Sequence, residues 1–260
     1  MTGPSQFSAA FSTELLKLRR GVVVRLGSAL LVLLLPLASI GAVALARSPQ
    51  LRGPSAAKFA PYASGDLAVT HLIVLGQLLA VSVLLAGGFA AAWSFGREFG
   101  DGTVGAMAGL PVGRGVVALA KGVLLTAWLT LCAVAAVLVT GMLSVMVGGR
   151  PSADGWHAAA VALGVGLLSA GLCAPFGWAA SVTRSQLGTV GVLIGLVMVT
   201  QVVVTLGGGQ WFPYAIPSLA SGMGGDDLAQ VGPGSLALTA LMGPLGVLAA
   251  AARWARLDRT

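Results

Sequence analysis

Charged side chains are scarce in this chain. Of its 260 residues, 9% are Asp, Glu, Lys or Arg, whereas an ordinary soluble domain has about 25%. Hydrophobic residues make up 57% of the chain, and the mean hydropathy is +0.93. So few charges cannot cover the surface of a water-soluble fold, and the composition therefore excludes the soluble globular classes.

Residues that several kinds of catalysis require are also missing. A nucleotide-binding P-loop needs Gly-Lys followed by Ser or Thr, but the three lysines, Lys17, Lys58 and Lys121, are followed by Leu, Phe and Gly. The chain therefore cannot bind ATP through that motif. No Gly-x-Ser-x-Gly elbow accompanies the two histidines, His71 and His157. We interpret both as packing or interfacial residues and predict no catalytic residue.

Cysteine and acidic residues are equally few. Cys132 and Cys173 stand alone in apolar surroundings, which favours small packing residues over a disulfide or a metal site. Asp226 and Asp227 form an acidic pair in a glycine-rich segment, where the sequence leaves open plain solvation or a cation or sugar-nucleotide role. No acid falls inside an apolar window, although ion-coupled carriers commonly place one there. Coupling to backbone-bound sodium stays open, but the energy of an active transporter would more naturally come from another subunit.

The scarce charges bracket six long apolar windows. The predicted spans are about 26–46, 67–95, 122–148, 156–182, 187–206 and 234–252. Each can hold the ~20 apolar residues that a helix needs to cross a ~30 Å hydrocarbon layer. Continuous apolar runs favour helices over the alternating strands of a barrel. The sequence therefore predicts an all-α polytopic membrane protein, with a single transmembrane domain over residues 1–260.

The stretch after the fifth span is broken by glycine and proline. Residues 207–217 contain three consecutive glycines and two prolines, and they include Trp211, Phe212 and Tyr214. Aromatic residues of this kind are enriched at membrane interfaces. We predict an outer loop with a short re-entrant or broken helical segment between spans five and six.

The positive charges predict the orientation in the membrane. With six spans and both termini in the cytoplasm, eleven of the fifteen basic residues and four acids lie inside, which leaves a net charge of +7 there and zero outside. This distribution follows the positive-inside rule. The basic pI of about 10.5 is explained by topology, so we expect no nucleic-acid partner.

The first 25 residues have a pattern of their own. Phe7, Phe11, Leu15 and Leu18 recur at helical spacing, which predicts an amphipathic helix over about 5–20 that lies in the membrane interface before the first span. A secretory signal peptide ending near residues 44–46 is the alternative. The apolar stretch is long for such a peptide, and 25 residues precede it.

The inner loop over residues 96–115 is the most specific stretch. Asp101 or Thr103 can begin a short helix, and Pro111 disfavours helix at Leu110, so about two turns are delimited. A helix of this kind, flanked by Arg97, Glu98 and Arg114, is suited to docking in a groove on a partner. An ordinary amphipathic connector is the alternative.

Small residues and prolines recur within the spans. Gly188, Gly191 and Gly195 in the fifth span, and Gly88 with Ala92 in the second, indicate either close packing within the chain or a dimer face. A proline interrupts each of spans one, four and six, at Pro36, Pro175 and Pro244, where it removes a backbone donor and predicts a kink.

Two segments resemble the motifs of one transporter family. Glu98, Gly102, Thr103, Pro111, Arg114 and Lys121 resemble the Glu-x-x-x-Gly-Thr, Pro-x-x-Arg and Lys pattern of ABC-2 type transporter permeases. Glu14, Lys17 and Arg20 resemble the Glu-x-x-Lys-x-x-Arg of that family's interfacial helix. The chain departs from the pattern at Gly113, where Ser is common, and in a loop helix rich in Gly and Ala.

The resemblance implies the membrane half of an ABC exporter in a bacterial cytoplasmic membrane. Such a permease dimerises with an identical or related copy and works with a separate ATP-binding subunit, which would hold the ATP and magnesium. The residues expected to couple to that subunit are Arg97, Glu98, Asp101, Gly102, Thr103, Met107, Leu110, Pro111 and Arg114. Those expected in the interfacial helix are Phe7, Phe11, Glu14, Lys17 and Arg20.

Small permeases of this family often export antibiotics, peptides or lipids, and the sequence does not choose among them. Two other functions stay open. One is a membrane protein for immunity or an accessory role that binds a toxic ligand or partner without transporting it, and the other is an ion-coupled carrier.

Overall fold

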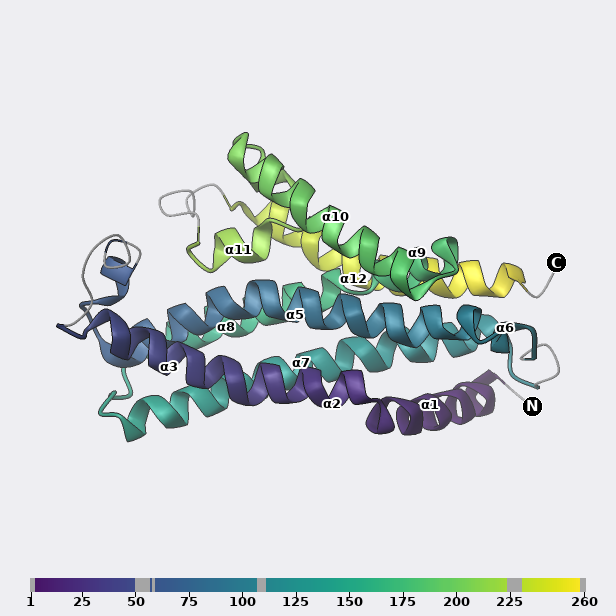
Figure 1. Ribbon diagram of the computed structural model, residues 1–260, viewed down its shortest axis with the longest axis horizontal. Coiled ribbons are helices and arrows are strands. Elements are labelled where there is room, and N and C mark those ends of the chain that lie inside the picture. The colour runs from purple at the N-terminus through teal and green to yellow at the C-terminus, as the bar shows by residue number, and fades with distance from the viewer. Residues whose placement is uncertain (1–2, 50–56, 58, 107–110, 224–230, 258–260) are drawn as a thin grey trace.

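The computed structural model describes residues 3–49, 57, 59–106, 111–223 and 231–257, and in these ranges the chain is helical without any strand. The helices run along the long axis of an elongated bundle, and the two termini lie at the same end of it (Figure 1). An even number of crossings produces this arrangement.

Within the described residues, six helical units are long and apolar enough to cross a membrane, as the sequence predicts. The first consists of α2 (Val22–Ala29), a π-helical turn (Leu30–Leu34) and α3 (Leu35–Ala46). The others are α5 (Leu67–Gly100), α7 (Arg114–Met146), α8 with α9 (Ala153–Leu172 and Pro175–Thr183), α10 (Gln186–Thr205) and α12 (Pro233–Arg256). The shorter elements are α1 (Gly3–Arg20), α6 (Thr103–Ala106), α11 (Ile216–Ala220) and the 3₁₀ turns Ala60–Tyr62 and Gly209–Trp211.

Helices α5 and α7 extend beyond the apolar windows of the sequence. α5 continues through Arg97 and Glu98 to Gly100, and α7 begins at Arg114, two turns before Lys121. Charge-free windows therefore underestimate these helices, because several of their charged residues are paired inside the bundle. The opposite end of α5 begins at Asp66, whose carboxylate accepts from the Val69 amide at 3.0 Å.

The core is built around α5, which packs on α8, α7, α10 and α3, whereas α12 packs on α7, α8 and α9; Figure 1 shows α5 running through the middle of the bundle. Glycines allow close approach: the side chain of Leu193 on α10 packs over Gly88, and Cys173 lies against Gly87. Both cysteines are buried and free, and the thiol of Cys173 donates to the carbonyl of Ser169 at 3.2 Å. They are packing residues, as predicted.

The three prolines within the spans have different effects. Pro175 begins α9, after a break at Cys173 and Ala174 that divides the fourth span. Pro36 follows the π-helical turn, so the missing donor coincides with an irregular hydrogen-bond pattern. Pro244 lies inside α12, which continues on both sides of it as one helix.

The stretch between α10 and α12 is broken into a 3₁₀ turn and α11, and it packs back on the bundle. Ala215 and Ile216 are buried, and the Tyr214 hydroxyl donates to the carbonyl of Leu172 at 3.3 Å. Trp211 is exposed. The predicted Asp226–Asp227 pair lies outside the described residues.

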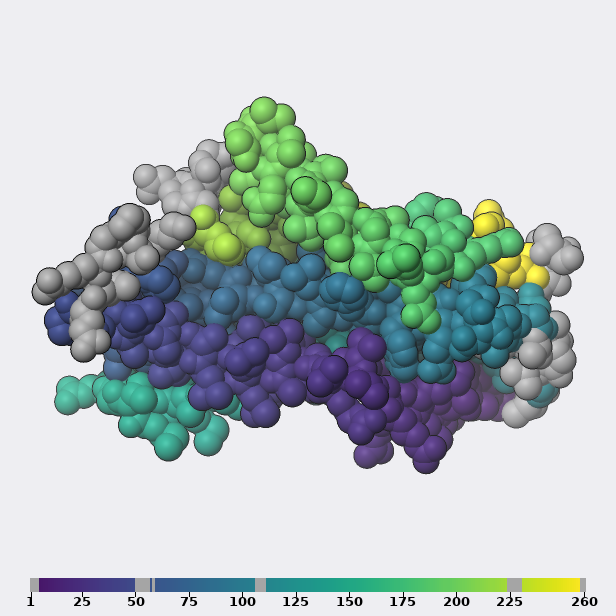
Figure 2. All heavy atoms as spheres, in the orientation of Figure 1, coloured from purple at the N-terminus to yellow at the C-terminus, as the bar shows by residue number. Residues whose placement is uncertain are grey.

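Helix α10 contrasts with α5. Only 11% of the apolar window of α10 is buried within the chain, against 56% for α5, and α10 projects from the rest of the molecule (Figure 2). No atom lies within 4 Å of a Cβ built at Gly191 or Gly195. Close packing within the chain is therefore the explanation for Gly88 but not for these two glycines.

Candidate functional site

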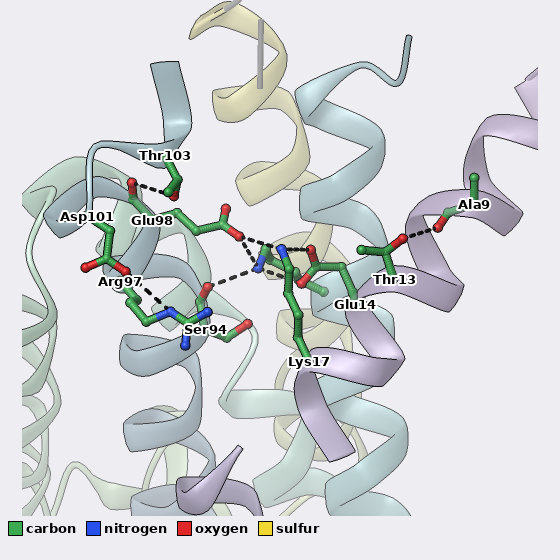
Figure 3. Close-up of polar contacts among 10 residues, drawn as sticks. Ala9, Thr13, Glu14, Lys17, Ser94, Arg97, Glu98, Asp101 and Thr103 are labelled. Atoms are coloured by element: carbon green, nitrogen blue, oxygen red, sulfur yellow. Dashed lines mark hydrogen bonds and ion pairs between the residues drawn. The ribbon is translucent and has the colours of Figure 1, made fainter. Parts of the chain in front are cut away.

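A cluster of four charged side chains lies near the end of the bundle that holds the termini. We call Glu14 and Lys17 of α1, Glu98 of α5 and Lys121 of α7 the charge cluster. The Lys121 ammonium lies 2.7 Å from Glu14 and 2.9 Å from Glu98, and the Lys17 ammonium lies 2.6 Å and 3.2 Å from the same two carboxylates. Figure 3 shows Glu14 and Lys17 pointing from α1 toward Glu98. The cluster therefore joins three helices.

Three members of the charge cluster are almost fully buried. Lys121 is 3% exposed, Glu98 4% and Glu14 5%, whereas the side chain of Lys17 is 36% exposed. Lys121 also donates to the carbonyl of Ser94 at 3.1 Å. Two carboxylates balance two ammonium groups, and this balance offsets the large cost of removing single charges from water.

Lys17 titrates differently from a free lysine. Its partial burial lowers its pKa, but the hydrogen bond and charge of Glu14, together with the charge of Glu98, outweigh this effect and raise the pKa above 10.5. Lys17 therefore remains charged through the physiological range, and its attraction to both carboxylates is retained.

Helical spacing explains how α1 contributes Glu14. Ala10, Glu14 and Leu18 recur every four residues and form the buried face of α1, because residues at i and i+4 lie on one side of a helix. Phe7 and Phe11 flank this face and pack against Val117 and Ala120 of α7. The predicted apolar face is present, but it contacts α7, and an acid lies at its centre.

Aromatic side chains fix the end of α5 against α12. The buried ring of Trp254 meets Phe95 and Phe99 edge-on, at centroid distances of 5.7 Å and 5.6 Å. On a neighbouring face of α5, a Cβ at Gly96 would lie 2.9 Å from the backbone of Gln186, the first residue of α10. The last turns of α5 are thus held by α1, α7, α10 and α12 at one level.

Arg97 and Glu98 belong to α5 and not to a loop, which corrects the sequence prediction. The Arg97 guanidinium lies 3.6 Å from Asp101 and over the ring of Trp93 at 5.1 Å. Glu98 is buried in the charge cluster. The α-helical ladder continues because both side chains find partners one turn away or across the bundle, so Glu98 does not present its carboxylate to a docking partner.

The chain turns sharply after α5. Asp101 is the C-cap of α5, and Gly102 adopts a φ of +67°, which glycine tolerates without a Cβ penalty. α6 begins at Thr103, one of the two predicted starting residues, but the Thr103 hydroxyl donates to the carbonyl of Glu98 at 3.3 Å. α6 is therefore tied directly to the residue that anchors the charge cluster.

The remaining predicted residues separate into three groups. Pro111 is exposed beside the loop, whereas Met107 and Leu110 lie outside the described residues. Arg114 is buried, and its guanidinium donates to the carbonyl of Leu257 at 2.6 Å. Arg114 thus satisfies a carbonyl at the end of α12. Arg20 is exposed, and its carbonyl accepts from Arg25 at 3.0 Å.

Sequence reasoning named Lys121 as a motif match but gave it no role, and it missed Trp254 and Ser94. A signal for Lys121 was present, because it is the only charge between Arg114 and Arg150. A lysine with so few charged neighbours in sequence needs a partner from another helix. Nothing in the sequence indicated which carboxylate it meets.

A family model described as ABC-2 family transporter protein matches residues 10–207. The chain belongs to this family. The matched region contains all four members of the charge cluster and extends from within α1 to the end of α10, whereas α11 and α12 lie beyond it. No curated protein matches the chain.

Membership of the ABC-2 family accounts for what the chain lacks. An ABC-2 permease is the membrane component of a transporter and has no ATPase function of its own, in agreement with the missing P-loop. Permeases of the family generally work with an ATP-binding subunit. The six apolar helices make this chain a multi-pass membrane protein.

Proposed function

We propose that the chain is the permease of an ATP-driven exporter, and that the charge cluster transmits movement from a separate ATP-binding subunit to the spans. The observation that carries the proposal is the junction of α1, α5 and α7 by Glu14, Glu98 and Lys121, directly beside α6. The ATP-binding subunit would hold the ATP and magnesium. An antibiotic, a peptide or a lipid would be exported from a bacterial cell across its cytoplasmic membrane.

The location of α6 supports this role. α6 lies at the end of the bundle where both termini lie (Figure 1), and basic residues of that end include Arg19, Arg97 and Arg256. The positive-inside rule places this end in the cytoplasm, where an ATP-binding subunit operates. The first turns of α5, the last turns of α7 and the first turns of α8 would then lie at the opposite, outer end. Residues 207–220 would form a broken segment that returns into the bundle.

A rigid connection from α6 to α1 follows from the contacts. Thr103 at the start of α6 bonds to the carbonyl of Glu98, and the carboxylate of Glu98 bonds to Lys17 and Lys121. A push on α6 is therefore transmitted through one turn of α5 into a buried cluster. Because close-packed interiors respond by switching between discrete arrangements, the cluster would move α1 together with α5.

The charge cluster also bears on the ion-coupled alternative. Both of its carboxylates are paired with ammonium groups at 3.2 Å or less. Binding and releasing a proton or cation at Glu14 or Glu98 would require these ion pairs to break in every cycle. The arrangement therefore favours a mechanical junction driven by another subunit.

A second copy of the permease would pack on α10. Its apolar window is the least buried of the six spans, and Gly191 and Gly195 leave its surface open for close approach. Dimerisation would cover this face, with the substrate passing between the two copies.

The experiment is co-expression of the chain with a candidate ABC-type ATP-binding subunit from the same genome, followed by site-specific photo-cross-linking. A photoreactive residue at Gly105 of α6, where a side chain meets open space, is expected to cross-link to the ATPase. The matched control is the same residue at Gly41 of α3, which also meets open space. Equal yields at both positions would contradict docking at α6.

The role of the cluster is tested by Glu98→Gln in the same complex. The expected outcome is that the ATPase still co-purifies while its stimulation by the permease in vesicles is lost. Full stimulation would reject the coupling role. Toxin protection without ATP-dependent transport would instead indicate an immunity or accessory protein, and transport driven by an ion gradient without the ATPase would indicate a carrier.

A further inference from the structure

An apolar groove lies at the end of the bundle away from the termini. It has a volume of about 310 Å³ and is formed by the first turns of α5, the last turns of α7 and the first turns of α8. Leu72, Val137, Met142 and Ala159 are among its lining residues. This volume lies at the lower end of the range of small-molecule sites, about 300–1,000 Å³.

The groove opens on a surface that faces the bilayer. The α7 side chains along it are large, apolar and exposed: Leu138 is 62% exposed, Met142 68% and Val145 54%. α7 is one of the spans, so these side chains meet lipid hydrocarbon and not water. In a bilayer, an apolar groove in this position is surrounded by lipid acyl chains, so an acyl chain is the expected occupant.

One charged side chain lines the groove. Arg150 lies in the connection between α7 and α8 and is exposed, and it makes no hydrogen bond or ion pair with another described residue. Trp156, one turn into α8, is 72% exposed on the same groove. A guanidinium binds phosphate oxygens in pairs, and an exposed Trp near the end of a span is typical of the headgroup level.

We infer that this groove binds one anionic phospholipid, with an acyl chain between α7 and α8 and the phosphate against Arg150. The charge of Arg150 determines which headgroup is preferred. No described side chain balances this positive charge, so a lipid with a net negative charge binds better than a zwitterionic one. The nearest acid in sequence, Asp154, does not line the groove.

The bound lipid would lie on a polar connection between three spans. Ser144 lines the groove, and its hydroxyl lies 2.9 Å from Nδ1 of His71 on α5. The carbonyl of His71 accepts from Ser39 on α3 at 2.6 Å. A lipid that fills the groove therefore covers the contact that joins α3, α5 and α7, and its binding is expected to raise the melting temperature of the protein.

The test is native mass spectrometry of the intact protein in detergent, with phosphatidylglycerol and phosphatidylcholine of the same chain length. The wild type is expected to retain one phosphatidylglycerol in preference to phosphatidylcholine. Arg150→Gln should lower phosphatidylglycerol retention about fivefold and abolish the preference, whereas Arg150→Lys should keep most of it.

The second variant fills the groove. Gly141 lines it, and no atom lies within 4 Å of a Cβ built there, so Gly141→Leu should fold normally and lower retention of both lipids. Gly41→Leu on α3, also with open space around the Cβ, is the control and should retain lipid as the wild type does. Wild-type retention in either Arg150→Gln or Gly141→Leu would overturn the inference. So would a change of oligomeric state in Gly141→Leu without a change in lipid, because a second copy would then occupy the groove.

Discussion

At the end of the bundle that holds the termini, buried ion pairs of 2.6–3.2 Å join α1, α5 and α7. At the opposite end, neutral hydrogen bonds from Ser39 to His71 and between His71 and Ser144 join α3, α5 and α7. Buried charges without partners are far more costly than unpaired neutral groups. The first end therefore tolerates only arrangements that keep its charges paired, whereas the second can separate at a lower cost.

This difference suits a transporter that is driven from one side. Under the proposed function an ATP-binding subunit would need a stiff attachment, and the charge cluster together with the packing of Trp254 would supply it. Under the same proposal, the passage of a substrate would require helices that can separate, and the end with weaker connections would allow this. The variants below weaken one end at a time, from the largest expected effect to the smallest.

The largest effect is expected from Lys121→Met. This change leaves Glu14 and Glu98 buried with Lys17 as their one remaining partner in the cluster, and it should lower the free energy of unfolding by about 3–5 kcal/mol. Unfolding in detergent micelles, followed by tryptophan fluorescence, measures it.

The matched control combines Lys121→Met with Glu14→Gln. It leaves the Lys17–Glu98 pair, whose atoms are 3.2 Å apart in the wild type, and restores the charge balance. The double variant should recover at least half of the loss. A double variant as unstable as Lys121→Met would show that packing, and not charge balance, holds this end.

Gly96→Val tests the close packing at the end of α5. The added side chain would meet the backbone of Gln186, which lies 2.9 Å from a Cβ at this position, and overpacking of this kind costs about 1–3 kcal/mol. The same unfolding measurement applies. Gly100→Val, where no atom lies within 4 Å of the Cβ, should have a much smaller effect, and equal losses would contradict tight packing of α5 on α10.

Ser144→Ala weakens the opposite end. It removes the hydrogen bond to His71, and hydrogen bonds between membrane helices are typically worth about 0.6 kcal/mol and at most about 1.7. Unfolding in detergent should show a loss several times smaller than that of Lys121→Met. A loss as large as that of Lys121→Met would mean that the two ends do not differ in the way described.

The smallest effect concerns Lys17 and pH. Its pKa is raised above 10.5 in the folded protein, so its stabilising contribution is fully present below pH 10.5 and is lost as the pH rises through the raised pKa. Lys17→Met should cost about 1 kcal/mol or less at neutral pH, because the side chain is partly exposed. It should also flatten the decline in stability above pH 10.5, and an unchanged decline would mean that another group titrates.

The charge pattern predicted the number and places of the six spans, because a charge within a hydrocarbon layer is costly. It failed where charges pair across helices: Glu98 and Arg97 continue α5, and Lys121 lies inside α7. Pro36 and Pro175 lie at helix irregularities, and Pro244 lies inside one continuous helix. Hydropathy treats each charge alone and cannot register a partner that is distant in sequence.

The family motifs identified all four members of the charge cluster as residues of interest, but not their arrangement. Glu14, Lys17, Glu98 and Lys121 were all motif matches. The sequence placed Glu98 on a docking surface and gave Lys121 no role. The Lys17–Glu98 and Lys121–Glu14 pairs are separated by 81 and 107 residues. Local sequence periodicity cannot predict such pairs, because only the packing of the helices brings them together.

The sequence by itself predicted six apolar segments long enough to cross a membrane and showed that the chain has no P-loop, since both conclusions follow from residue types and their spacing. The tertiary structure decided which charges are surface charges and which form a buried junction. It also decided that Arg114 faces the end of α12 and that α10 leaves a face open. Those outcomes depend on which helix surfaces pack together. The packing is stabilised by contacts between residues that are far apart in the chain.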